Sequence, residues 1–247
     1  MNKVERYLNL VILFSVPFYF LNLLEIEPLF LNLPLSFIAI IVPCLLAGYF
    51  IYQEEGIVGV KQWLKSTYQF PTFRLIVVSV IIMPIIFSLA FIFKNECLDL
   101  FHSDRLARES GIIFVLFWVG AVIEELGWTA YATKKIQNED NIFSTGFLIG
   151  LYWGLWHLFP YLAQERTLVE SLILILTTIG YRIIMGYLYF ASNKLTMTGI
   201  IFHTMINFVP EVLPGGYDAF HYNHVLILVW LVALLMHYKH GKKEKFL

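Results

Sequence analysis

The feature that most constrains this chain is a series of long, uninterrupted apolar runs. The run LIVVSVIIMPIIFSLAFIF at 75–93 is apolar on every side. A helix that crosses a bilayer needs about 20 mostly apolar residues, whereas the strands of a membrane barrel are shorter and alternate in polarity. Only 14% of the 247 residues are charged, against roughly 25% in soluble domains. The sequence therefore predicts an all-α, polytopic membrane helix bundle.

Eight segments are predicted to form transmembrane helices. They lie at about 7–24, 30–52, 73–93, 111–133, 142–162, 168–192, 196–210 and 224–240. The seventh segment is short, so we expect it to be tilted or partly interfacial. No internal repeat or low-complexity segment divides the chain, which predicts a single integral-membrane domain over 1–247.

Lysine and arginine are unevenly distributed between the two sides of the predicted membrane. With both termini placed in the cytoplasm, twelve of the 17 lie on the cytoplasmic side and four lie outside, while Arg182 falls within a span. Because short cytoplasmic loops are enriched in these residues, both termini are predicted to be cytoplasmic. The loop 94–110 carries three of the four exceptions. The formal net charge of -1 provides no basic surface for nucleic acid.

Several polar side chains occur inside the predicted spans, where they are costly and usually functional. They are Glu124 and Glu125 in the fourth span, His157 in the fifth, Arg182 in the sixth, and His203 and Asn207 in the seventh. At 1.5 Å per residue, Glu124, His157 and Arg182 fall near mid-membrane. We therefore expect these polar groups to line one cavity.

Helical geometry refines this expectation. Residues four apart share a helix face, and the chain has such pairs in Trp153 with His157 and in His203 with Asn207. Adjacent residues point about 100° apart. One of the two glutamates is therefore expected to face the cavity, and the other to face a neighbouring helix.

This set of groups fits the hydrolysis of an amide by an activated water. A carboxylate in a partly wet apolar pocket can act as general base, and a nearby histidine can orient the water. A second histidine with an asparagine can donate hydrogen bonds to the oxyanion, a contribution of roughly 3–4 kcal/mol per donor. No Ser or Cys nucleophile stands beside a base in a known motif, and no cofactor is predicted.

The same residues resemble the CAAX-protease and bacteriocin-processing family of intramembrane proteases. The first family motif has two glutamates and an arginine, often as E-E-x-G-W-R-G, and here the sequence reads EELGWTA at 124–130. The second motif has an aromatic residue four before a histidine, here Trp153 and His157. The third is H-x-x-x-N, here His203 and Asn207. The resemblance covers about 110–210, which is the predicted catalytic-motif core.

The resemblance implies an intramembrane endopeptidase that depends on glutamate. Glu124 would be the base and His157 would help to orient the water. His203 and Asn207 would form the oxyanion site, and Glu125 would be a supporting glutamate. The substrate would be a membrane-associated peptide or protein, and the protein would reside in a cell membrane or an endomembrane.

The sequence departs from the family pattern at one place, where Thr129 replaces the motif arginine. This change leaves Glu125 in need of another positive partner. Arg182 is the only Lys or Arg in the middle of a span, and it would be costly there without a partner, by roughly 2.5–3.5 kcal/mol. The hypothesis is that Arg182 supplies this charge from the sixth span.

Three other functions compete with the protease. Glutamate and histidine side chains are ordinary zinc ligands, so a zinc-dependent form of the protease is one alternative, although no HExxH helix is present. Thr129 at the arginine position favours a non-catalytic immunity or regulatory protein of the same fold. A proton-linked transporter would also use buried charges, but such transporters are commonly built from inverted repeats, and none is evident.

Overall fold

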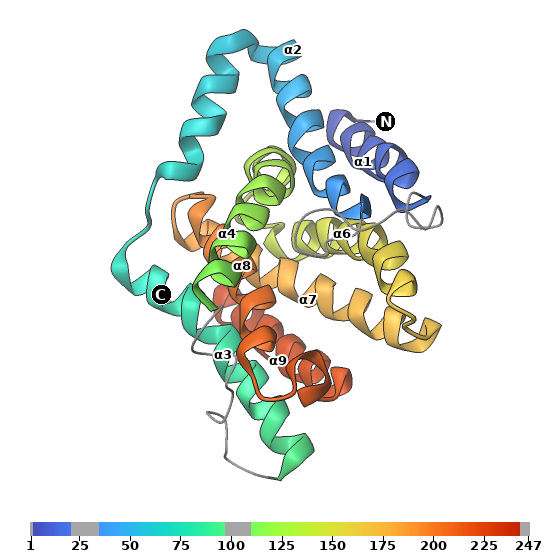
Figure 1. Cartoon of the computed structure of the whole chain (residues 1–247). Helices are drawn as coiled ribbons and strands as arrows, with labels where there is room; N and C mark the ends of the chain where they lie inside the picture. The colour runs from blue at the N-terminus through green and yellow to red at the C-terminus, as the bar shows by residue number, and fades with distance from the viewer. Residues whose placement is uncertain (1, 21–34, 97–109, 243–247) are drawn as a thin grey trace.

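The computed structural model describes residues 2–20, 35–96 and 110–242, and within these ranges the chain is helical, without a strand. The long helices are α1 Lys3–Phe20, α2 Ile41–Lys65, α3 Phe73–Asn95, α4 Ser110–Gly127, α6 Ile142–Ala163, α7 Leu168–Ala191, α8 Met197–Val212 and α9 Tyr222–Gly241 (Figure 1). The short elements are η3 Leu35–Ile40, η4 Ser66–Tyr68, the π-helix η6 Trp128–Thr133, α5 Lys134–Ile136 and η7 Gly216–Ala219.

Each of the eight predicted helices is present, and the all-α fold class is confirmed. The parts 21–24 and 30–34 of the first two predicted spans lie outside the described residues. Helix α2 continues beyond the predicted end of its span at 52, to Lys65. It does so through a bend at Gly56, whose φ of 63° is in the left-handed region that favours glycine.

Six of the helical segments in the described ranges are long and apolar enough to cross a membrane, judged by length and composition. They are Ile38–Tyr68, Phe73–Asn95, Ser110–Ile136, Ile142–Ala163, Leu168–Ala191 and Tyr222–Gly241. Within the described residues, two of the eight predicted spans, those of α1 and α8, are not among these six. Helix α1 carries three charges, at Lys3, Glu5 and Arg6, and α8 has only 16 residues.

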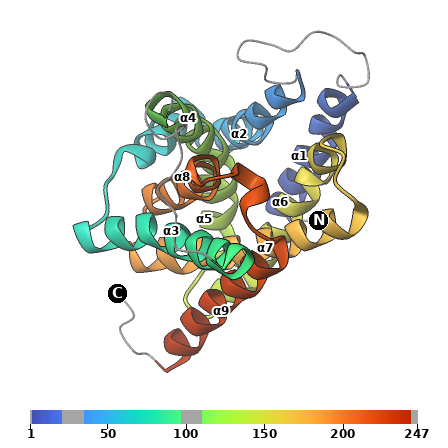
Figure 2. The same ribbon diagram turned by 60° about the horizontal axis from the view of Figure 1, so that its bottom comes forward.

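Helix α8 lies at the centre of the bundle, in contact with α3, α4 and α7 (Figure 2). Every residue from Met197 to Ile206 is buried. The outer helices instead expose large apolar side chains, among them Phe73 on α3, Val115 on α4 and Leu172 on α7. Exposed apolar surface on several helices is expected of a protein that is surrounded by lipid.

Helices α6 and α7 pack closely against each other, and glycines make this approach geometrically feasible. A Cβ atom at Gly146 would lie 2.6 Å from Ile183 Cα, and one at Gly150 would lie 2.6 Å from Ile179 Cα. Small residues allow membrane helices to approach each other in this way. The contact matters for the site, because it brings the His157 helix against the Arg182 helix.

Candidate active site

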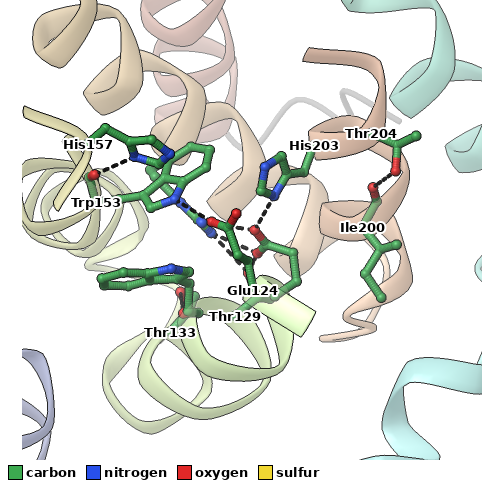
Figure 3. Close-up of polar contacts among 11 residues, drawn as sticks. Glu124, Thr129, Thr133, Trp153, His157, Ile200, His203 and Thr204 are labelled. Atoms are coloured by element: carbon green, nitrogen blue, oxygen red, sulfur yellow. Dashed lines mark hydrogen bonds and ion pairs between the residues drawn. The ribbon is translucent and has the colours of Figure 1, made fainter. Parts of the chain in front are cut away.

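A cavity of about 240 Å³ lies between α4, α6, α7 and α8. Its polar wall contains Glu124, His157, His203 and Asn207. Figure 3 shows the labelled side chains of Glu124, His157 and His203 converging from three different helices. Three segments that are distant in sequence thus share one cavity, but Arg182, which was also expected to line it, is not among the lining residues.

Glu124 is the glutamate that faces the cavity. Its Oε2 accepts a hydrogen bond of 2.9 Å from Trp153 Nε1, and the residue is only 7% exposed. Trp153 is itself buried, with its ring 5.2 Å from the His157 ring and 4.9 Å from the His203 ring. This tryptophan therefore fixes the carboxylate and separates the two imidazoles.

Glu125 turns away from the cavity and is fully buried. Arg182 donates to both of its oxygens, from Nη1 to Oε2 at 2.7 Å and from Nη2 to Oε1 at 2.8 Å. The hydroxyl of Thr129 donates to Oε2, and His203 Nδ1 lies 2.8 Å from Oε1. Each oxygen thus has two donors, so Glu125 is held in place by its neighbours.

The predicted ion pair between Arg182 and Glu125 is therefore present. It is bidentate, which is the strongest form of such a pair. The Arg182 guanidinium also lies 3.9 Å from the centroid of the Trp153 ring, a distance at which cation–π attraction is substantial. Thr129, at the position of the motif arginine, bonds to the same carboxylate. The positive charge near Glu125 thus comes from α7.

His157 has a defined tautomer. Its Nδ1 lies 2.8 Å from the carbonyl oxygen of Trp153. A carbonyl oxygen only accepts, so Nδ1 must carry the proton, and in the neutral ring Nε2 is then an acceptor. The His157 ring stacks on Tyr161 at 5.7 Å between centroids. An acceptor nitrogen on a cavity wall is suited to holding a water.

His203 is oriented by Glu125. Because the carboxylate oxygen accepts, His203 Nδ1 carries a proton in this contact. Its other nitrogen, Nε2, donates only when the ring is doubly protonated. Asn207, one turn further along α8, is partly exposed and lines the same cavity. His203 and Asn207 thus line the same wall of the cavity, and the Glu125 carboxylate holds the His203 ring in place.

Other cavity residues were not anticipated from the sequence. These are aromatic side chains and an arginine on the far wall, namely Tyr161, Tyr181, Tyr217, Phe220, Tyr222 and Arg166. Aromatic residues are frequent throughout this chain, so no local pattern distinguishes these ones. The π-helix η6 was also not predicted, although such turns are often found at functional sites. It begins three residues after Glu125.

Among the described residues, no group of three or more His, Cys, Asp or Glu side chains is arranged to hold a metal ion. The prediction that the protein needs no cofactor is not tested by this observation. Cys97 lies outside the described residues, and Cys44 is a free thiol, partly buried within α2.

Comparison with known proteins finds sequences that are similar to this chain. Residues 107–209 match the family model described as type II CAAX prenyl endopeptidase Rce1-like. The chain is 26% identical over 159 residues to CAAX prenyl protease 2 of Methanococcus maripaludis. That alignment covers 60% of this chain and 58% of the Methanococcus protein, so it spans little more than half of this relative. Over this matched segment, which contains the three motifs in their expected order, the chain is similar to the Rce1-like CAAX proteases.

Proposed function

We propose that the protein is an intramembrane endopeptidase that hydrolyses a peptide bond of a membrane-associated peptide or protein. The observation that supports this most is the convergence of Glu124, His157, His203 and Asn207 on one cavity. The family match supports the protease class. In this proposal the partners are the lipid bilayer and the peptide substrate, and the location is a cell membrane or an endomembrane.

The proposed reaction uses water as nucleophile. The carboxylate of Glu124 takes a proton from a water that also donates to His157 Nε2, and the water oxygen attacks the peptide carbonyl carbon. The oxyanion that forms is stabilised by the Asn207 amide and, when doubly protonated, by His203 Nε2. The protonated Glu124 then gives its proton to the leaving nitrogen, the C–N bond breaks, and an acid and an amine are released.

Glu125 and Arg182 act in this proposal as positioning residues. Glu125 orients the His203 ring through the 2.8 Å contact at Nδ1. Arg182 fixes Glu125 and supports the Trp153 ring, which in turn holds Glu124. The base and the oxyanion donors are thus connected through one buried network, without direct contact between Glu125 and the cavity.

A cleavage assay tests the proposal. The full chain is reconstituted in liposomes with synthetic membrane-anchored peptides, some prenylated and some resembling leader peptides, and products are identified by mass spectrometry. We expect cleavage by the wild type and none by Glu124→Gln, with both proteins folded to the same extent. Glu139→Gln is the matched control, because Glu139 is exposed in the connection between α5 and α6. Equal cleavage by wild type and Glu124→Gln would reject the mechanism.

The same assay separates the alternatives. A zinc-dependent protease would lose activity in a chelator and regain it with added zinc. A non-catalytic immunity or regulatory protein would cleave no peptide, and its biological effect would survive the change Glu124→Gln.

A further inference from the structure

A second cavity, of about 290 Å³, lies in the bend of α2. One of its walls is formed by residues on both sides of Gly56, and the other by residues of η6 and α5. Figure 1 shows α2 as two arms that meet at a sharp bend near the top of the view. Among the described residues, this cavity and the active-site cavity have no lining residue in common. It is therefore a separate candidate binding site.

The second arm of α2, which follows the bend, is fixed against the rest of the protein. Buried Trp63 donates from Nε1 to the carbonyl oxygen of Leu126 at 3.0 Å, and this bond ties the arm to the end of α4. The Trp63 ring also lies beside the first arm, since a Cβ atom at Gly48 would be 3.5 Å from Trp63 Cζ3. The cavity is thus held open by contacts that belong to the fold itself.

The bend of α2 lies where the hydrocarbon region of a bilayer is expected to end. The apolar segment Ile38–Tyr68 begins at Ile38, and its rise from there to Gly56 is roughly 27 Å at 1.5 Å per residue. The hydrocarbon core of a bilayer is about 30 Å thick. An ion-paired cluster of Lys3, Glu54 and Lys135 lies at the same level. The cavity is therefore at the height of the lipid headgroups.

The outer surface of the second arm is suited to contact with lipid. Its apolar side chains Ile57, Val58 and Leu64 are exposed, and Lys61 and Lys65 are exposed between and beside them. Apolar and cationic side chains on one exposed helical segment are typical of a segment that lies in the membrane interface. A lipid whose acyl chains lie along this arm has its headgroup within reach of the cavity.

Two opposite charges line the cavity without an ion pair between them. Glu55 and Lys134 both line it, both are exposed, and neither forms a salt bridge with another residue in the described ranges. Lys135, by contrast, is paired with Glu54. Gly59 leaves room for the glutamate, because a Cβ atom there would lie 2.8 Å from Glu55 Oε2. The cavity therefore offers one carboxylate and one ammonium group to a ligand.

The wall of the cavity also contains a hydrogen-bond donor that lacks an acceptor. Tyr131 lines the cavity and is 1% exposed, and its hydroxyl has no hydrogen-bond partner among the described residues. Buried polar groups in proteins nearly always have a partner. A tyrosine hydroxyl beside a lysine ammonium group is suited to donating to an oxygen of a bound phosphate.

We propose that this cavity binds the headgroup of a zwitterionic phospholipid, of the kind found in phosphatidylethanolamine. The headgroup phosphate accepts hydrogen bonds from Lys134 and Tyr131, and the headgroup ammonium pairs with the Glu55 carboxylate. A purely anionic headgroup, such as that of phosphatidylglycerol, leaves Glu55 without a partner. Headgroup binding can be measured without any cleavage, so its test is separate from that of the proposed function.

Native mass spectrometry of the full chain in detergent, with one lipid added at a time, measures this binding. We expect the wild type to bind phosphatidylethanolamine at least tenfold more tightly than phosphatidylglycerol. Lys134→Gln should weaken binding of both lipids at least fivefold, and Lys134→Arg, which keeps the charge, should restore it. Glu55→Gln should remove the preference between the two lipids.

The matched controls are Lys65→Gln and Glu139→Gln, because both side chains are exposed and neither lines the cavity. Both controls should bind as the wild type does, and equal unfolding temperatures should show that all variants fold alike. A wild type without lipid preference, or a Lys134→Gln protein with unchanged affinity, would overturn the assignment. Displacement of the lipid by an equal concentration of free phosphoethanolamine would also overturn it, because the ligand would then be a soluble molecule.

Discussion

Arg182 holds both carboxylate oxygens of Glu125, at 2.7 and 2.8 Å, from a different helix. In the family pattern the arginine lies on the same helix as the two glutamates, at the position that Thr129 occupies here. In this chain the positive partner of Glu125 therefore lies on α7, and not at the position of Thr129. The ion pair consequently also connects two helices, so its loss should affect folding as well as chemistry.

Removal of Arg182 should strongly destabilise the protein. Its side chain is 2% exposed and that of Glu125 is 0% exposed, and breaking a buried pair by removing one partner costs about 3–5 kcal/mol. Arg182→Met should therefore lower the unfolding temperature in detergent, and Glu125→Gln in the same chain should restore part of the loss. Lys3→Met is the control, because the Lys3 side chain is 73% exposed in its pair with Glu54 and such pairs contribute about 0–1 kcal/mol. Additive effects in the double mutant would contradict the pairing.

Trp153→Phe should reduce catalysis more than stability. It removes the indole N–H that donates to Glu124 at 2.9 Å and keeps an aromatic ring beside Arg182. A hydrogen bond to a charged group contributes about 1.5–3 kcal/mol, so kcat should fall roughly 10–100-fold with little change in KM. Trp156→Phe is the matched control, because the Trp156 indole donates to Ser15 at 2.8 Å, away from the cavity. Equal losses of kcat in the two variants would show that the bond to Glu124 has no special role.

Asn207→Ala should slow the reaction without unfolding the protein. Loss of one oxyanion donor typically lowers kcat by about 10²–10³, and the partly exposed Asn207 side chain contributes little to packing. Thr204→Val on the same helix is the control, because the Thr204 hydroxyl bonds to the Ile200 carbonyl of its own helix. Single-turnover cleavage rates, with circular dichroism to monitor folding, provide the comparison. A normal rate for Asn207→Ala would remove this residue from the oxyanion site.

Gly150→Ala should separate α6 from α7. Its new Cβ would meet Ile179 Cα at 2.6 Å, and overpacking of this kind costs about 1–3 kcal/mol. The unfolding temperature should fall, and cleavage should weaken because Trp153 and His157 would shift relative to Arg182. Gly120→Ala serves as control, since a Cβ at Gly120 meets nothing within 4 Å. A Gly150→Ala protein as stable as Gly120→Ala would show that this contact is not tight.

The sequence alone determined the helical membrane fold. Its low charge content excludes a soluble domain, and its long apolar runs match membrane-spanning helices and lack the alternating polarity of barrel strands. It also identified Glu124, His157 and His203 as one candidate set, because polar side chains inside apolar membrane helices are costly and usually functional. Helix periodicity further required that Glu124 and Glu125 face different directions, but it gave no means of assigning each glutamate to a direction.

The sequence offered the pairing of Glu125 with Arg182 only as a hypothesis, and the tertiary structure decided it, because the contact depends on the packing of α4 against α7. The position of Glu124 on the cavity wall likewise depends on the packing of α4 against α6, α7 and α8. The tertiary structure also revealed the tautomer of His157, the bend of α2 at Gly56, and the central, short α8. These features arise from contacts between residues distant in the chain. The local sequence pattern carries no information about such contacts. They depend on the register between helices, which is fixed by close packing such as that at Gly146 and Gly150.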